Sequence, residues 1–229
     1  MPATRVLALL VVCAGFAVPS LAQTPPAAPR APSGPRAPRV EPGTGYRAFV
    51  VFDHVSLAAS ETFDAILGKT SLTAMGAGGE YRFWKGLFVR GAFSTMKATG
   101  TRAFVVQGQV VSVGIPLEVE IAPVELAAGW RMPLGRSQRL VVYGGGGLLS
   151  VKYREASDFA GSGDDTDSRF SGRHAFAGVD VRVWQWVFAG VEAQYRTVPD
   201  ALGERGIAKE FSEDDLGGTA IRILVGVRR

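Results

Sequence analysis

The chain is almost free of cysteine and histidine, with one of the first and two of the second among 229 residues. The single cysteine, Cys13, lies in an apolar segment near the N-terminus, and the rest of the chain has none. A disulfide framework is therefore excluded. We expect the stability of the folded chain to come from packing and from backbone pairing.

Long hydrophobic runs are also missing, since no apolar stretch after residue 22 reaches the ~20 residues that a membrane-spanning helix needs. The apolar run from Val6 to Val18 follows Arg5 and precedes Ala22, and small residues at this place are typical of signal peptidase cleavage. We interpret residues 1–22 as a secretory signal peptide. If the exported chain enters a membrane, it must do so with strands.

Charge of one sign is likewise modest. The net charge of +4 falls to +3 when Arg5 leaves with the signal peptide, and basic residues are not interleaved with aromatic ones. We therefore expect no nucleic-acid partner. Residues 23–44 are rich in Pro and Ala, which favours an extended periplasmic tail or linker; a docking motif for a periplasmic partner or the cell wall is the alternative.

What the chain does have is strict alternation. In "WVFAGVEAQYR", residues 186–196, Val187, Val191 and Tyr195 are among the apolar residues that alternate with Glu192 and Gln194. A period of two predicts a β-strand. In a soluble barrel the apolar face would point to the core, whereas in a transmembrane barrel it would meet lipid.

From residue 45 onward the sequence predicts strands and no helix. The eight expected strands are 45–53, 72–83, 87–97, 117–131, 139–154, 172–183, 187–197 and 217–228. Their connections alternate between short turns and long loops, as in outer-membrane barrels, and the even number puts both ends of the barrel on the short-turn side. We interpret residues 103–114 as strands continuing above the membrane, although an extra strand pair is an alternative.

The parity of a residue, its odd or even position along a strand, assigns it to one of the two faces of that strand. The residues expected to face lipid are Gly79, Tyr81, Phe83, Leu87, Val89, Gly91, Phe93, Val141, Tyr143, Leu149, Val151, Tyr153, Val179, Val181, Val187, Ala189, Val191, Tyr195, Ile221, Ile223, Val225 and Val227. The first strand is apolar on both faces. In the fourth, the alternation slips near Pro123, which predicts a bulge because proline cannot donate to the ladder.

Charged residues of the opposite parity should fill the barrel. They are Glu80, Arg82, Arg90, Glu125, Arg131, Lys152, Arg154, Asp180, Arg182, Glu192, Arg196 and Arg222, eight basic and four acidic. An eight-stranded barrel is only wide enough for side chains, so we interpret them as structural, with a narrow anion-preferring pore as the alternative. Asp180 and Arg182 lie on a strand next to Glu192 and Arg196, and we expect pairs across these strands.

All four tryptophans, Trp84, Trp130, Trp184 and Trp186, lie at or beside the expected short turns. Tryptophan prefers the headgroup level of a bilayer, where its ring is half buried and its N–H stays wet. This distribution favours a membrane barrel over a soluble sandwich.

The segments "GEYRFWKGLFVRGAF", "PVELAAGWRM" and "AFAGVDVRVWQWVFAGVEAQYR" resemble the eight-stranded outer-membrane β-barrel proteins of Gram-negative bacteria, the OmpA/OmpX-like superfamily. The resemblance covers residues 45–229 and implies a single all-β domain, a closed antiparallel transmembrane barrel. It also implies recognition by the barrel-insertion machinery, although family members usually end in an aromatic residue and this chain ends in Arg228 and Arg229.

Candidate sites for chemistry are few. "YGGGGLLS" lacks the Lys-Ser/Thr of a phosphate loop, and in "GDDTDSR" Arg169 stands where a calcium loop would need an oxygen ligand. His54, Ser56 and Glu61 are reminiscent of lipid A deacylase barrels, but triads are defined by geometry. His174 should lie on the outer rim. We therefore assign no catalytic, cofactor-binding or metal-binding residue.

The sequence thus predicts an outer-membrane barrel that is not an enzyme and whose long extracellular loops serve a structural, adhesive or recognition role. A lipid A deacylase-like enzyme and a soluble lipocalin-like binder are the alternatives. Expected partners are outer-membrane lipid and lipopolysaccharide, the insertion machinery and an unknown extracellular ligand.

Overall fold

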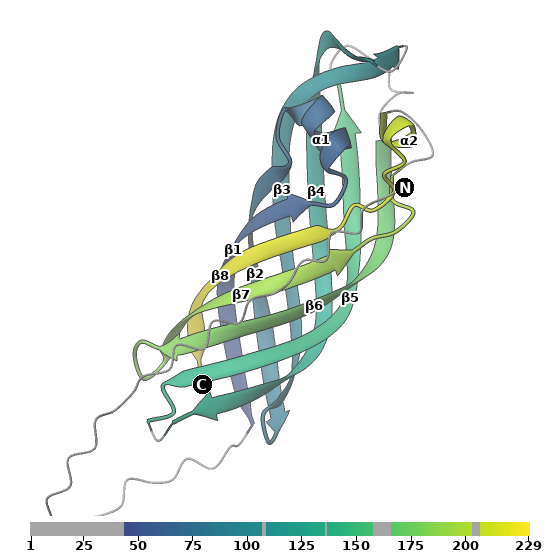
Figure 1. Ribbon diagram of the computed structural model, residues 1–229. Coiled ribbons are helices and arrows are strands. Elements are labelled where there is room, and N and C mark those ends of the chain that lie inside the picture. The colour runs from purple at the N-terminus through teal and green to yellow at the C-terminus, as the bar shows by residue number, and fades with distance from the viewer. Residues whose placement is uncertain (1–43, 107–108, 136, 158–165, 203–206) are drawn as a thin grey trace, which may run out of the picture. The chain divides into compact units, whose positions relative to one another are not determined.

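The computed structural model describes residues 44–229 apart from 107–108, 136, 158–165 and 203–206. The expected signal peptide and nearly all of the expected tail lie outside the described residues. Eight antiparallel strands form a closed barrel in which each strand pairs with its successor and β1 pairs with β8 (Figure 1). The strands are β1 (Gly45–Leu57), β2 (Ser71–Trp84), β3 (Leu87–Val106), β4 (Gln109–Leu134), β5 (Leu140–Ala156), β6 (Thr166–Arg182), β7 (Val187–Thr197) and β8 (Gly218–Arg228). The expected fold class is confirmed.

Two short helices correct the expectation of none. Helix α1 (Ser60–Leu67) lies between β1 and β2, and α2 (Ile207–Phe211) lies between β7 and β8. In α1, Phe63 is fully buried and Ile66 and Leu67 pack against the same apolar cluster, which is the i, i+3, i+4 spacing of one helix face. Neither of the helices that the structure describes is long and apolar enough to cross a membrane.

The connections follow the expected alternation. Short turns join β2 to β3, β4 to β5 and β6 to β7, at the end where β1 begins and β8 ends. At the other end β3 and β4 stay paired as far as Val106 and Gln109, with a register shift between Thr101 and Ala103. Residues 103–106 and 109–114 therefore continue β3 and β4, and no extra strand pair is present among the described residues.

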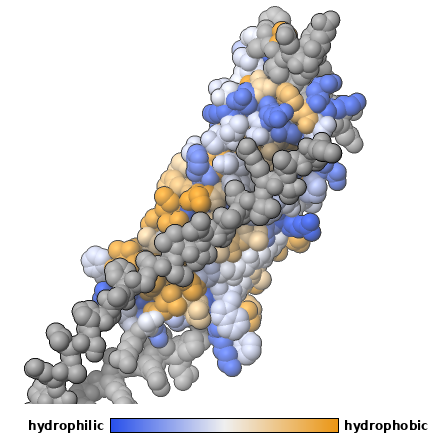
Figure 2. All heavy atoms as spheres, in the orientation of Figure 1, coloured by the Kyte–Doolittle hydropathy of each residue, from blue (hydrophilic) through white to orange (hydrophobic). Residues whose placement is uncertain are grey.

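The half of the barrel near the short turns has an apolar outer surface, and we call it the membrane half. Val191 is 54 % exposed, whereas its neighbours Glu192 and Gln194 are buried inside. Phe93 and Ile223 face outward in the same way. In Figure 2 hydrophobic surface covers much of this half, and hydrophilic surface gathers toward the other end. The predicted lipid-facing parity is confirmed here for β2, β3, β7 and β8, and Val179 and Val181 on β6 are also exposed.

The other half, which we call the outer half, has the reverse polarity. Its interior holds an apolar cluster, the outer plug: Val55, Leu57, Ala59, Phe63, Leu72, Ala74, Met96, Ala98, Leu117, Val119, Ile121, Leu149, Val151, Tyr153, Val198, Ala201, Leu216 and Ala220. The outward residues are polar, among them His54, Thr73, Lys97 and Lys152. The outer half is therefore built like a soluble barrel, with its apolar face inward.

This reversal corrects two predictions. Pro123 causes no bulge, because β4 keeps one register with β5 from Glu118 to Leu134. Val119 and Ile121 point into the outer plug, and Val124 points outward, so the apolar face changes sides while the strand stays regular. In β5 the predicted parity was wrong throughout. In the outer half Leu149, Val151 and Tyr153 are buried and Lys152 and Arg154 are exposed. In the membrane half, where the polarity is not reversed, Tyr143 is nevertheless buried in the lumen beside Arg131.

The four tryptophans lie where the sequence predicts them. Trp84 ends β2, Trp130 is near the end of β4, and Trp184 and Trp186 lie in the turn between β6 and β7. All four are between 48 % and 67 % exposed, as expected for rings at a bilayer interface.

Candidate functional site: the filled lumen

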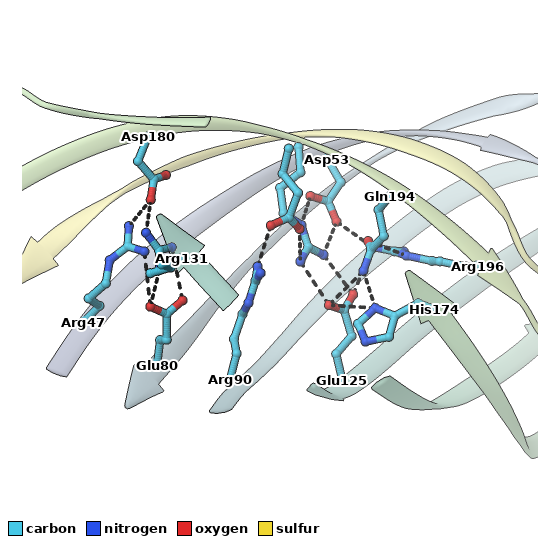
Figure 3. Close-up of polar contacts among 12 residues, drawn as sticks. Arg47, Asp53, Glu80, Arg90, Glu125, Arg131, His174, Asp180, Gln194 and Arg196 are labelled. Atoms are coloured by element: carbon cyan, nitrogen blue, oxygen red, sulfur yellow. Dashed lines mark hydrogen bonds and ion pairs between the residues drawn. The ribbon is translucent and has the colours of Figure 1, made fainter. Parts of the chain in front are cut away.

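The lumen of the membrane half is filled by buried ion pairs. Nearest the short turns, Arg131 on β4 donates from Nε to Glu80 on β2 at 2.6 Å and from Nη1 to Asp180 on β6 at 2.5 Å (Figure 3). Arg47 on β1 also contacts Asp180, with Nη2 2.9 Å from Oδ2. A Cβ at Gly190 would clash with Asp180, so glycine makes room for this carboxylate.

Above this cluster, Arg90 lies among aromatic rings. Its Nη1 donates to Oε2 of Glu192 at 2.7 Å, and its guanidinium lies 4.0 Å from the ring centre of Phe176. The ring centres of Phe88 and Tyr143 each lie 5.6 Å from the same guanidinium. Rings pack around a paired cation and fill the width of the lumen, which is consistent with favourable cation–π contacts at a desolvated site.

A third layer joins four strands. Arg222 on β8 donates to Asp53 on β1 at 2.7 and 2.8 Å, and to Glu125 on β4 at 2.9 and 3.0 Å. Arg196 on β7 donates to the same two carboxylates at 3.1 and 3.0 Å. Arg222 is fully buried. Each carboxylate is shared by two guanidiniums, and this sharing offsets the cost of taking the charges out of water.

The charges of these three layers balance. The carboxylates are Asp53, Glu80, Glu125, Asp180 and Glu192, and the guanidiniums are Arg47, Arg90, Arg131, Arg196 and Arg222. The sequence predicted an excess of basic residues. Lys152 and Arg154, which it placed inside, point outward instead, and Arg82 and Arg182 are half-buried, as Arg47 is.

Pairing also differs from the prediction. Asp180 contacts Arg47 and Arg131, and Glu192 contacts Arg90, all on strands that are not neighbours of their own. Glu192 also lies 3.6 Å from Arg222, its direct neighbour on β8. Arg47 and Asp53 were not among the predicted interior charges, because β1 is apolar on both faces. Alternation along β1 could have identified both residues, because Arg47 and Asp53 lie on the same face of the strand as the buried Phe49 and Val51.

Beyond the charged layers, the outer plug closes the barrel a second time. Helix α1 and residues 213–217 lie beyond the plug, and we call them the cap. The carboxylate of Glu213 accepts hydrogen bonds from the N–H groups of Glu61 at 3.1 Å and Thr62 at 2.8 Å, in the first turn of α1. Asp215 accepts from Val198 and Gly217, both at 2.7 Å. The contacts of Glu213 link the β1–β2 connection to the β7–β8 connection, and those of Asp215 lie within the β7–β8 connection.

The residues singled out for chemistry do not form a site. His54 and Ser56 are exposed on the outer wall of β1, Glu61 is exposed on α1, and no hydrogen bond joins these three described residues. His174 is buried in the lumen beside Gln194 and 3.7 Å from Glu125, so its predicted place on the rim was wrong. The residues that the structure describes include no group of three potential metal ligands.

A closed eight-stranded antiparallel barrel with a filled lumen, an apolar outer band and interfacial tryptophans defines the fold of the outer-membrane β-barrels of OmpA/OmpX-like type. No family model and no curated protein matches the chain. Among solved structures, Ail, the attachment invasion locus protein of Yersinia pestis, is similar at 13 % identity and a TM-score of 0.51 in its complex with the heparin analogue sucrose octasulfate; 82 % of this chain and 99 % of that chain are covered.

Another structure of Ail gives 13 % identity and a TM-score of 0.50, over 82 % of this chain and 100 % of that chain. Neisserial surface protein A gives 15 % identity and a TM-score of 0.44, over 81 % of this chain and 96 % of that chain. The predicted resemblance in fold is confirmed.

Proposed function

We propose that the protein is a non-conducting outer-membrane barrel that holds a rigid outer half beyond the bilayer for structural, adhesive or recognition contacts. The observation that carries this proposal is the double closure of the lumen. Arg222, Glu125 and Asp53 join opposite walls in the membrane half, and the outer plug fills the other half. A barrel of this size closed by packed side chains leaves its outer surface as the part available to partners.

The outer half is well suited to contacts because it is ordered by packing. Phe63 is fully buried in the plug, and Glu213 fixes the first turn of α1. A preorganised surface loses less conformational entropy on binding than mobile loops do. The likeness to Ail supports an adhesive role as a proposal for this chain, since that protein is named for attachment and invasion.

The test has two arms. The purified protein in planar bilayers should show no unitary conductance, and cells that display it should attach to host-cell monolayers better than cells with the empty vector. An attachment control is a variant with Asp215→Ala, which removes the carboxylate that accepts from Val198 and Gly217 and so loosens the cap. Steady ion conductance would contradict the closed lumen, and equal attachment by all three strains would remove the adhesive role.

An enzyme that modifies lipid is the second candidate from the sequence, and His54 is the residue that suggests it. His54 and Ser56 do share the outward face of β1 just beyond the apolar band. The His54→Ala variant should leave lipid A acylation unchanged when lipid extracts are compared by mass spectrometry. A lost acyl chain that reappears in the variant would establish the enzyme instead.

A further inference from the structure

Four arginines gather at the short-turn end of the lumen, and we call them the mouth arginines. They are Arg47 near the start of β1, Arg82 near the end of β2, Arg182 at the end of β6 and Arg228 at the end of β8. All four are half-buried and have the parity of the lumen-facing residues on their strands. Because β6, β7, β8, β1 and β2 are consecutive in the closed sheet, these side chains form one group at the mouth of the barrel.

The mouth arginines repel one another. The register places Arg228 directly opposite Arg47, and like charges at such positions destabilise a sheet. The guanidinium of Arg228 is also repelled by Arg182 and Arg82, whereas Asp180 attracts it. A half-buried group of like charges costs stability, and a cost of this kind is typical of functional sites.

The carboxylates near the mouth are already used by other cations. Arg47 belongs to the first charged layer, in which two guanidiniums balance two carboxylates. Arg182 and Arg228 add two positive charges beyond that layer, and within the described residues neither of them forms an ion pair. Arg182 donates to the carbonyl oxygen of Ser137 at 3.2 Å, and the side chain of Arg228 has no hydrogen-bond partner in the described part of the chain. Their guanidiniums therefore have donors available to an anion.

The charge and the arrangement of the mouth arginines fit a phosphate group. A phosphate monoester carries about 1.5 to 2 negative charges at pH 7, which matches the excess of two. Arg182 and Arg228 come from strands on either side of β7, and Arg47 stacks on Phe188 of β7 with its guanidinium 3.5 Å from the ring centre. These guanidiniums approach from different directions, and phosphate presents its oxygens tetrahedrally, whereas a carboxylate presents two oxygens in one plane.

The position of the mouth arginines fixes the side from which the anion comes. The short turns of outer-membrane barrels face the periplasm. Above the mouth, Arg131 closes the lumen through its bonds to Glu80 and Asp180 (Figure 3). The backbone N–H of Arg228 donates to the carbonyl oxygen of Trp186 at 2.8 Å, which puts this arginine at the height of the interfacial tryptophans. The anion therefore reaches the mouth from the periplasm or from the headgroups of the inner leaflet.

We propose that the mouth arginines form a phosphate-binding site open to the periplasm. Arg182 and Arg228 donate to the phosphate oxygens, and Arg47 and Arg82 add positive charge around them. Phosphate is the recognised chemistry, and its source is free inorganic phosphate or the headgroup phosphate of an inner-leaflet phospholipid. The site lies at the opposite end of the barrel from the outer half, and it does not depend on the adhesive role.

The experiment uses the purified full-length protein in octyl glucoside micelles and HEPES buffer, which contain no phosphate. Inorganic phosphate, titrated in a calorimeter, should bind to the wild type. The variant Arg182→Gln/Arg228→Gln should bind it about tenfold more weakly, the loss for two partly exposed charge-assisted contacts. The control Arg169→Gln/Arg173→Gln removes the same charge from exposed residues of β6 in the outer half and should bind as the wild type does. Short-chain phosphatidylglycerol, titrated in the same way, tests the headgroup as the source.

The single variant Arg228→Gln separates this role from a structural one, and it replaces the double variant if that variant does not fold. Because the other mouth arginines repel Arg228, its removal should raise the urea midpoint of heat-modifiable migration in phosphate-free buffer. Added phosphate should then raise the midpoint of the wild type more than that of the variant, since a ligand stabilises the form that binds it. Sodium chloride at the same ionic strength should have a smaller effect, because it only screens the repulsion.

Equal phosphate binding by the wild type and both double variants would overturn the proposal, and so would the absence of binding to either phosphate probe. Succinate that binds as tightly as inorganic phosphate would overturn the assignment to phosphate. A lower urea midpoint of Arg228→Gln with unchanged phosphate binding would give this arginine a structural role instead. Binding that the double variant loses for phosphatidylglycerol alone would support the site with the headgroup as its source, and binding lost for inorganic phosphate would support it with the free anion.

Discussion

The carboxylate of Glu125 on β4 accepts two hydrogen bonds from the guanidinium of Arg222 on β8, at 2.9 and 3.0 Å, across the lumen of the barrel. These two strands are not neighbours in the sheet. A bond of this kind fixes the distance between opposite walls, which backbone pairing between adjacent strands does not do directly. The same carboxylate holds Arg196 at 3.0 Å.

Replacing Glu125 by Gln should therefore lower the free energy of unfolding by about 3–5 kcal/mol, because the buried guanidiniums of Arg196 and Arg222 would lose one of the two carboxylates that they share. The measurement is the urea midpoint of heat-modifiable migration for protein folded in lipid vesicles. Glu118→Gln is the matched control, since Glu118 is on the same strand but exposed. Equal midpoints for the two variants would show that the cross-lumen pair is not a stabilising contact.

Val191 and Gln194 test which face of β7 meets lipid. Val191→Arg should impair folding into vesicles by about 2–4 kcal/mol, the cost of a charged side chain near the bilayer centre. Gln194→Ala should have a milder effect, because its side chain lies in the lumen. Thr73→Arg, outward on β2 beyond the apolar band, is the control and should fold normally. Normal folding of Val191→Arg would contradict the membrane assignment.

Gly190 and Gly79 form a matched pair. A Cβ at Gly190 would clash with Asp180 and disturb its contact with Arg131, whereas the nearest atom to a Cβ at Gly79 is 3.6 Å away. Gly190→Ala should therefore destabilise the barrel by about 1–3 kcal/mol, as overpacking of a core does. Gly79→Ala should be nearly neutral. Urea titrations of both variants give the comparison, and a neutral Gly190→Ala would mean that the charged layer tolerates displacement.

Phe63 tests whether the cap depends on the outer plug. Phe63→Ala removes a fully buried ring from α1, a change that costs about 3–5 kcal/mol in a packed core. We expect this loss to appear as faster proteolysis at the outer end in intact cells. The membrane half should keep its heat-modifiable migration, because its ion pairs are untouched. Unchanged proteolysis would show that α1 is held by other contacts.

The sequence predicts the membrane half well for a physical reason. Lipid on one side and a charged lumen on the other impose strict alternation, so Val191 beside Glu192 and Ile223 beside Arg222 can be assigned from parity alone. The outer half has water outside and apolar packing inside, and the same parity rule gives the opposite answer there. Tyr153 and Lys152 were placed on the wrong sides for that reason, and the four glycines of β5 concealed the correct parity.

The sequence by itself determined the number of strands, their order, the short-turn end and the lipid-facing surface of four strands, because period-two hydrophobicity and interfacial tryptophan are local signals. Only the tertiary structure decided the partners of the buried charges. Asp180 meets Arg131 from β4 and Arg47 from β1, since closing the sheet brings strands together that are far apart in the chain. The tertiary structure also decided that the slip of alternation near Pro123 is a reversal of polarity and not a bulge, because β4 keeps one register with β5 through this position.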